Sequence, residues 1–304
     1  MGRALAPPAA WPHLNPDAQF TLMSVTSLSH CAELAQRFDN DRFVCALFAP
    51  APVREALNVL YAFNIELSRI REVVREPMLG RIRLQWWIDA LDAVYAGQSS
   101  AAHPVADALA AVISGHALPR RHFDAMIGAR IQDFEDAAPA DLNALLGYAD
   151  ATSGALMALA LEVLGGASET SATIGRHVAI AWALIGLVRS VPFHARARRL
   201  YLPADLNRSA GLNALALYER GTTAGLGTVV RTVSEVAQEH LHAAREARGS
   251  VSKRALPAVL VATLADGYLR RLRAAGYDPF DARVQQRGTG MLLSVAANHI
   301  RGRY

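Results

Sequence analysis

Apolar residues recur at spacings of three and four along most of the chain, a pattern typical of amphipathic α-helices. It is clearest after Pro52, which fits the first turn of a helix because the N–H missing from proline has no helical partner there. A second, more polar stripe follows the same helix. The apolar stripe consists of Ala56, Leu60, Phe63, Leu67, Ile70 and Val74, and the polar stripe of Tyr61, Ile65, Ser68 and Glu72.

Prolines and glycines divide the rest of the chain into further helices. Pro77 and Gly80 break the first helix, Gly165 and Gly166 stop a long apolar one, and Pro192 kinks or ends another. We expect helices over about 82–95, after 103–104 and 118–119, over 140–164, 170–191, 223–248 and 253–275, and a short pair in 278–304. Strand-like alternation is absent beyond a few residues, which predicts a single all-α domain over residues 23–304.

The first 22 residues differ from the rest, because they carry four prolines and little periodicity. They lack the continuous apolar region of a secretory signal. We expect residues 1–22 to be a disordered leader. The alternative is that the start codon was placed too far upstream, so that this segment is not translated.

Composition narrows the function classes. The 304 residues are 52% hydrophobic and 19% charged, which excludes a disordered chain. A net charge of +4 is spread along the chain without a recognised binding motif, so no nucleic-acid partner is expected. Cys31 and Cys45 lack a metal-ligand spacing and are interpreted as free, buried thiols in a reducing compartment. The longest apolar runs, 155–164 and 178–188, are about half of a bilayer span, so no transmembrane segment is expected.

Two helical segments carry recognisable polar patterns. Residues 61–72 read YAFNIELSRIRE, and residues 189–203 read RSVPFHARARRLYLP. They resemble the two signatures of the squalene/phytoene synthase family, Y-A-F-C-R-x-x-D-D-x-x-D and R-D-x-x-E-D-x-x-x-G-R-x-Y-L-P. Other landmarks in matching order extend the resemblance over roughly residues 37–280, namely Phe43, Leu47, Phe48, Pro50, Arg54, 83–87, Leu91, Tyr95, Gly97, His103, Pro104 and 148–149.

The resemblance implies an isoprenoid synthase fold, in which two motif helices flank a central cavity and the polar stripe of the first helix faces it. It also implies a reaction in which a prenyl diphosphate ionises while Mg²⁺ ions bridge it to aspartates on both helices. Mg²⁺ requires oxygen ligands in near-octahedral geometry, and residues at i and i+4 present two carboxylates on one helix face.

Most of those carboxylates are replaced in this chain. The first motif has Ser68, Arg69 and Glu72, and the second has Ser190 and His194. One carboxylate, two hydroxyls and an imidazole cannot hold a cluster of Mg²⁺ ions, and the Arg69 cation would repel it. We therefore expect no metal site, no cofactor and no catalytic residue. Mg²⁺ would be needed only if the protein were an active prenyltransferase.

Several side chains have both a structural and a functional interpretation. We interpret Arg69 as an ion-pair partner of Glu66 and Glu72, and His194 as a helix-terminal or pocket-lining residue. Trp86 and Trp87 are interpreted as core and groove packing. The acidic patch of Asp133, Glu135 and Asp136 is interpreted as a solvated helix face, and the basic turn of Arg196, Arg198 and Arg199 likewise. Candidate anion or ligand contacts are Tyr61, Arg189, Arg196, Arg199 and Tyr201.

Within the superfamily, residues 62–67, the double tryptophan and residues 189–194 are similar to the mitochondrial complex I assembly factor branch (assembly factor six), which is regarded as non-catalytic. The resemblance therefore implies a protein that assists assembly of respiratory complex I (NADH dehydrogenase), with complex I subunits or other assembly factors as partners. The expected location is cytoplasmic, with peripheral binding to the inner face of the membrane as an option. A prenyl lipid is a candidate ligand of the cavity. The alternative is a Mg²⁺-dependent prenyltransferase that condenses two prenyl diphosphates head to head.

Overall fold

The computed structural model describes residues 28–304 except 75, 99–102, 136, 222, 248, 250 and 287. Every regular element in this part of the chain is helical, as the periodicity predicts. The prediction for residues 1–22 lies outside the described residues. The elements are α1 (His30–Phe38), α2 (Asn40–Ala46), α3 (Ala51–Val73), α4 (Pro77–Tyr95), α5 (Pro104–His116), α6 (Arg120–Arg130), η1 (Ile131–Phe134), α7 (Leu142–Ala149), η2 (Asp150–Gly154), α8 (Ala155–Val163), α9 (Glu169–Arg189), α10 (Val191–Arg196), α11 (Ala204–Ser209), α12 (Ala214–Arg220), α13 (Leu226–Glu246), α14 (Leu256–Val259), α15 (Val261–Ala274), α16 (Ala282–Gln285) and α17 (Thr289–Ile300).

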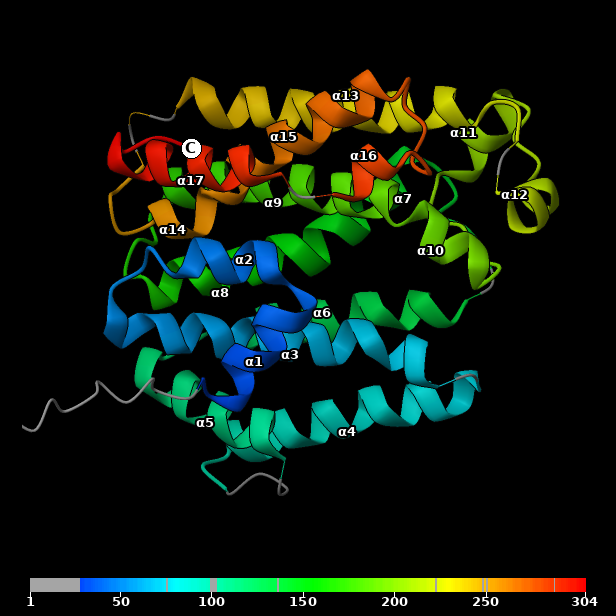
Figure 1. Ribbon diagram of the computed structural model, residues 1–304. Coiled ribbons are helices and arrows are strands. Elements are labelled where there is room, and N and C mark those ends of the chain that lie inside the picture. Colours follow the sequence, from blue (N-terminus) through cyan, green and yellow to red (C-terminus); the bar gives the residue numbers. More distant parts are fainter. Residues whose placement is uncertain are drawn as a thin grey trace, which may run out of the picture.

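The helices are stacked in layers, from α13 at the top of Figure 1 to α4 and α5 at the bottom. The second motif helix, α9, lies in the interior and packs against α13, α15 and α8. The first motif helix, α3, packs against α1, α5 and α8. Another helix, α8, contacts both motif helices and packs between them.

The apolar stripe predicted for the first motif helix is confirmed in α3. All six of its residues are buried, with Leu60 and Phe63 completely enclosed. Phe63 packs edge-on against Trp87 and Phe123, at ring-centroid distances of 5.1 and 5.5 Å. Pro52 lies in the first turn, as expected. This burial fixes the rotation of α3 and therefore the directions of its polar residues.

The helix after the first motif begins earlier than predicted. It was expected from about residue 82, but α4 begins at Pro77 because proline is favoured at the first position of a helix. Gly80 lies inside α4 and does not break it. A Cβ atom at this position would come within 1.9 Å of the Phe134 ring, so the glycine allows η1 to pack closely on α4. Gly80 was predicted to break a helix, but its role is to allow close packing between two helices.

The long apolar segment predicted over residues 140–164 is one continuous helical run, made of α7, the π-helical turn η2 and α8. It ends at Gly165, whose φ of +60° is the left-handed conformation that glycine adopts without strain. In the π turn the backbone hydrogen bonds span five residues instead of four. Thr152 and Ser153 lie in this turn, and both are buried. Its position matters because these two residues line the space between the motif helices.

The expectation that no segment reaches transmembrane length is wrong. The helical runs Leu142–Val163 and Glu169–Arg189 are long and apolar enough to cross a membrane, each with a mean hydropathy of 1.4. The two runs were underestimated because the polar residues between their apolar blocks were taken as ends. In each run 61% of the most apolar window is buried against other helices. The core helix of a soluble protein can be equally long and apolar, so length and composition alone do not show that either run crosses a membrane.

Cys31 and Cys45 are buried and form no disulfide, as predicted, while the reducing compartment stays a prediction. Burial raises the pKa of the Cys31 thiol to about 11, and the nearby carboxylates of Glu55 and Glu66 act in the same direction. A thiol with so high a pKa is mostly protonated at neutral pH and is a poor nucleophile.

Candidate functional site

The first motif lies on the C-terminal half of α3, where its side chains bond to one another and to neighbouring helices. The Ser68 hydroxyl donates to the carbonyl of Ile65 at 3.0 Å. Arg69 Nε lies 3.4 Å from the Glu72 carboxylate, and its guanidinium lies 3.8 Å from the centre of the Phe38 ring. The predicted pairing of Arg69 with Glu72 is thus confirmed, whereas its predicted pairing with Glu66 is not found. Glu72, the carboxylate that remains at a motif position, is exposed.

The second motif lies where α9 passes into α10. Ser190 joins the two helices, because it caps the end of α9 and the start of α10. Arg189 turns toward the C-terminal part of the fold. Its Nε donates to the carbonyl of Val284 at 3.3 Å, and its guanidinium lies 3.4 Å from the centre of the Tyr268 ring. Arg189 is therefore used in packing, and its role as an anion contact stays a prediction.

His194 lies in the last turn of α10, as expected for a helix-terminal residue. Its ring packs at a tilt against Tyr201, with 4.5 Å between the ring centres, and its Nδ1 atom is buried without a hydrogen-bond partner. Burial lowers the pKa of His194 to about 4, and the opposing effect of the Asp133 carboxylate does not offset it. The imidazole is therefore neutral at physiological pH.

The space between α3 and α9 contains a hollow of about 180 Å³. Asn64 contributes one wall, and Ala183 and Gly186 contribute the opposite one. Two cationic side chains, Arg42 from α2 and Arg130 from α6, complete the lining together with the polar residues of η2. A much smaller hollow of about 10 Å³ shares Arg42 and Ser153 with it and is also lined by Tyr61 and Met157.

Both arginines of this hollow are fixed by hydrogen bonds. Arg42 pairs with Asp39 at 2.7 Å and donates to the Ser153 hydroxyl at 2.9 Å. Arg130 donates to the Tyr148 hydroxyl at 2.6 Å and pairs with Asp133 at 3.3 Å. Burial lowers the pKa of Arg130, but Tyr148 and Asp133 outweigh it, so the net shift is upward and the guanidinium stays charged.

Asp133 is the centre of a buried polar network. It was interpreted as part of a solvated acidic face, and this is wrong because the residue is only 4% exposed. One of its oxygens accepts from the hydroxyls of Tyr148 at 2.8 Å and Tyr201 at 3.0 Å, and the other pairs with Arg130. Burial raises the pKa of both tyrosines. Glu135 is exposed, as expected, and Asp136 lies outside the described residues.

The basic turn after α10 is partly solvated. Arg196 and Arg198 are exposed, as predicted. Arg199 is half-buried and donates to the backbone carbonyl of Glu135 at 2.9 Å, while its Nη1 atom is enclosed without a partner. Arg199 and Tyr201 line a second hollow of about 240 Å³ on the side of Tyr148. The predicted ligand contacts are thus divided among three different places in the fold.

A family model for squalene/phytoene synthase matches residues 35–289. This chain belongs to the squalene/phytoene synthase family. The match covers both motif helices and the whole network around Asp133, so the family fold predicted from the two signatures is confirmed.

Family relatives include two kinds of protein. The chain is 29% identical over 275 residues to the NADH dehydrogenase (ubiquinone) complex I assembly factor 6 of Mus musculus, covering 90% of this chain and 82% of the relative. For the Homo sapiens assembly factor 6 the identity is 27% over 260 residues, covering 86% and 78%. A presqualene diphosphate synthase of Rhodopseudomonas palustris is 26% identical over 196 residues, covering 64% of this chain and 69% of the relative.

Solved structures of family members share the fold. A dehydrosqualene synthase in complex with ligand superposes with a TM-score of 0.75 at 16% identity, covering 89% of this chain and 94% of that one. A squalene synthase from Alicyclobacillus acidocaldarius superposes with a TM-score of 0.71 at 21% identity, covering 82% and 94%. At these identities the likeness establishes the all-α architecture alone.

The squalene/phytoene synthase frame is therefore kept, while the charges inside it differ from the family pattern. Among the described residues, no three His, Cys, Asp or Glu side chains come together closely enough to hold a metal ion. The hollow between α3 and α9 is lined by two arginines, Arg42 and Arg130, and by none of the residues at the carboxylate positions of the two motifs. The sequence interpretation missed Arg42, Arg130 and Tyr148 as members of this region. Tyr148 had a signal, since it matches a family landmark, but the two arginines had none.

Proposed function

We propose that this protein is a non-catalytic assembly factor for respiratory complex I. The observation that carries this proposal is the loss of the motif carboxylates in a chain that is similar to the assembly factors over most of its length. Similarity to the mouse assembly factor 6 extends over 90% of the chain, and similarity to the presqualene diphosphate synthase over 64%. The motif carboxylates that prenyl transfer needs are replaced by Ser68, Arg69, Ser190 and His194.

The physical reason is electrostatic. Leaving-group departure from a prenyl diphosphate needs Mg²⁺ as a Lewis acid and as a template between two sets of carboxylates. Here Glu72 is exposed and paired with Arg69, and the hollow between α3 and α9 is lined by Arg42 and Arg130. The carboxylates of Glu72, Asp39 and Asp133 are already paired with arginines, and the neutral imidazole of His194 supplies no negative charge to a Mg²⁺ ion.

A protein that has kept the fold without the metal ligands is free to act through its surface. We infer that its partners are complex I subunits or other assembly factors, and that it works in the cytoplasm or on the inner face of the membrane as a peripheral protein. The net charge of +4 is compatible with weak attraction to an anionic membrane surface. A prenyl lipid in the hollow between α3 and α9 remains a proposal.

The second candidate is a Mg²⁺-dependent prenyltransferase that condenses two prenyl diphosphates head to head. The likeness to a presqualene diphosphate synthase, which extends over 196 residues, favours it. It would require an active site rebuilt around Glu72, the carboxylate kept at a motif position.

Deletion of the gene in its own organism separates these two functions. We expect assembled complex I, measured on native gels and as NADH:ubiquinone oxidoreductase activity, to fall while the polyprenyl products in a lipid extract stay unchanged. Re-expression of the wild-type protein is the control and should restore complex I. A strain with normal complex I and a missing squalene-like or phytoene-like product would show that the enzyme function is the correct one.

A further inference from the structure

A further hollow lies on the side of α3 away from Asn64. It measures about 390 Å³ and lies between α3, α4 and the start of α5. Its wall on α3 is formed by Glu66, Arg69, Ile70 and Val73. At 3.6 residues per turn these positions are rotated by roughly half a turn from Asn64, which faces the space between the motif helices. The pocket is thus distinct from the hollow between α3 and α9, and of the motif positions it shares only Arg69.

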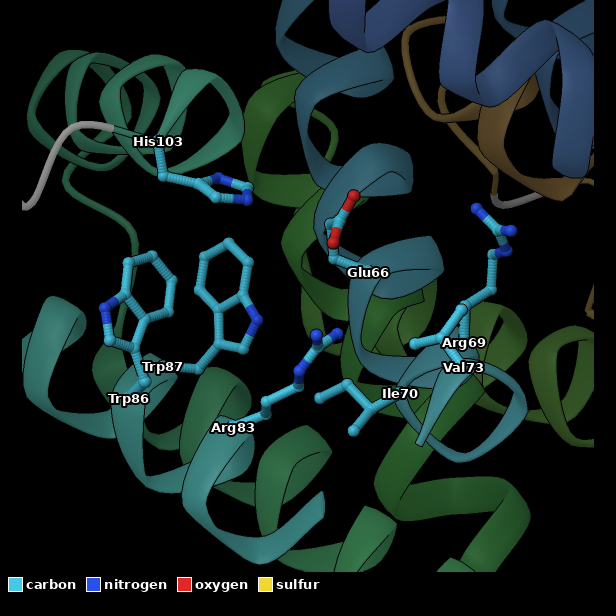
Figure 2. A pocket seen from close by; sticks show the side chains of 8 residues that line it. All are labelled: Glu66, Arg69, Ile70, Val73, Arg83, Trp86, Trp87 and His103. Carbon is cyan, nitrogen blue, oxygen red and sulfur yellow. The ribbon is translucent and has the colours of Figure 1, made fainter. Parts of the chain in front are cut away.

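Aromatic rings form the opposite wall of this pocket. Figure 2 shows Trp86 and Trp87 side by side on α4, with His103 at the start of α5 above them. The two tryptophan rings meet edge-on at 4.9 Å, and each lies 5.3 Å from the His103 ring. His103 Nδ1 is buried without a hydrogen-bond partner. Trp87 belongs to the core, as predicted, but Trp86 is half-buried and faces the pocket.

Two opposite charges face the interior of the pocket. In Figure 2 the Arg83 guanidinium extends from α4 toward α3, where Glu66 lies above it. Neither forms an ion pair within 4.0 Å with any described residue. Their neighbours do pair, Arg69 with Glu72 and Arg81 with Glu135. The pocket therefore presents both an acceptor and a donor group to an incoming molecule.

An apolar surface adjoins the pocket. Met78, Leu79 and Ile82 on α4 are 74%, 53% and 57% exposed, and Val73 at the pocket edge is 56% exposed. Met78, Ile82 and Trp86 follow one another at spacings of four, so they form a single stripe about 12 Å long on one face of α4. Large apolar side chains exposed in this way next to a pocket are typical of a protein-interaction surface.

We propose that this pocket and the α4 stripe bind an amphipathic helix of a partner protein, with one large apolar side chain inserted between Ile70 and the tryptophans. The inference rests on the proposed function and names the surface through which it acts. A helix places apolar residues at the same spacing of four that the α4 stripe offers, and tryptophan and arginine are the residues that dominate such interfaces.

The charges of the pocket favour a partner helix over a membrane surface. An anionic bilayer is attracted by cations alone, whereas the pocket offers Glu66 as well as Arg83, and Arg69 and Arg81 beside it are neutralised by carboxylates. A partner helix with residues of both signs complements both groups. A small metabolite would fill the pocket but would leave the stripe of Met78 and Ile82 exposed.

The test uses full-length variants in the deletion strain. Met78→Glu combined with Ile82→Glu charges the stripe, and Arg83→Glu reverses one pocket charge on an exposed side chain. The matched control is Leu293→Glu on α17, because Leu293 is 71% exposed and Met78 is 74% exposed. We expect assembled complex I to fall about tenfold in both stripe and pocket variants and to stay at the wild-type level in the control. Thermal unfolding of the purified variants checks that each is folded.

A second measurement identifies the occupant. A photo-reactive phenylalanine analogue placed at Met78 should cross-link to one complex I subunit or assembly factor in cells, and Arg83→Glu should abolish that product. Co-sedimentation with phosphatidylglycerol vesicles should be the same for the wild type and the stripe variant. Normal complex I in both variants, or vesicle binding lost in the stripe variant, would overturn the proposal. The deletion strain is scored first and tests the assembly function by itself. A failure of the docking proposal is therefore distinguishable from a failure of the proposed function.

Discussion

Replacing Asp133 with alanine is expected to lower the free energy of unfolding by about 3–5 kcal/mol. The change removes the acceptor of two tyrosine hydroxyls and leaves the Arg130 guanidinium enclosed without its carboxylate. Breaking a buried ion pair from one side is costly because the remaining charge has lost both water and its partner. Urea unfolding at neutral pH measures the difference from the wild-type protein.

The control for this substitution is two residues away. Glu135→Ala removes a carboxylate that pairs with Arg81 at 2.8 Å, but both side chains are more than half exposed. We expect that change to cost no more than about 1 kcal/mol, since exposed ion pairs contribute little. Equal losses for Asp133→Ala and Glu135→Ala would mean that the network around Asp133 does not stabilise the fold.

His194 is expected to make the protein less stable in mild acid. Its pKa is about 4 in the folded protein and 6.5 for the unperturbed side chain, so the unfolded chain binds a proton between these values and the folded protein does not. The stability contribution is complete above pH 6.5 and is lost as the pH falls toward 4. The full difference is about 3 kcal/mol, of which about 2 kcal/mol is lost at pH 5.

Urea unfolding of wild type and His194→Gln at pH 7.5 and pH 5 isolates this effect. Burial also lowers the pKa of His122, His177 and His240, so both proteins should lose stability in acid. The wild type should lose about 2 kcal/mol more than the variant. The same pH dependence in the two proteins would show that His194 titrates normally and that its ring is accessible to water.

The helices were predictable because each follows from local chemistry. The stripe from Ala56 to Val74 has the period of a helix, and Pro52, Pro104 and Gly165 define helix ends by the backbone conformations they favour. The start of α4 was missed because Pro77 fits two roles, the end of one helix and the first turn of the next. Local sequence does not distinguish these roles.

The polar network was not predictable from the sequence. Asp133 lies between Gln132 and Phe134 in a stretch of charged residues, and its burial depends on Tyr148 and Tyr201, which are 15 and 68 residues away. Periodicity reports which face of a helix is apolar, but not which carboxylate a distant hydroxyl will reach. The same limit applies to Arg42, whose partner Ser153 is 111 residues away.

The pocket beside α3 was also only partly predictable, because local sequence does not show how distant helices pack together. The double tryptophan was recognised as packing, and Trp87 is indeed buried against Phe63. That Trp86 instead faces a pocket with Glu66 depends on the placement of α4 against α3 and of His103 at the start of α5. Three helices must be positioned before this surface exists.

Calorimetric titration with a non-hydrolysable farnesyl diphosphate analogue, with and without Mg²⁺, tests most directly whether the motif helices have lost their metal site. Because Ser68, Arg69, Ser190 and His194 replace the carboxylates, we expect no metal-dependent binding. A catalytically active member of the family serves as the positive control. Micromolar binding that requires Mg²⁺ and disappears in Glu72→Ala would contradict the non-catalytic assignment and would identify a rebuilt active site.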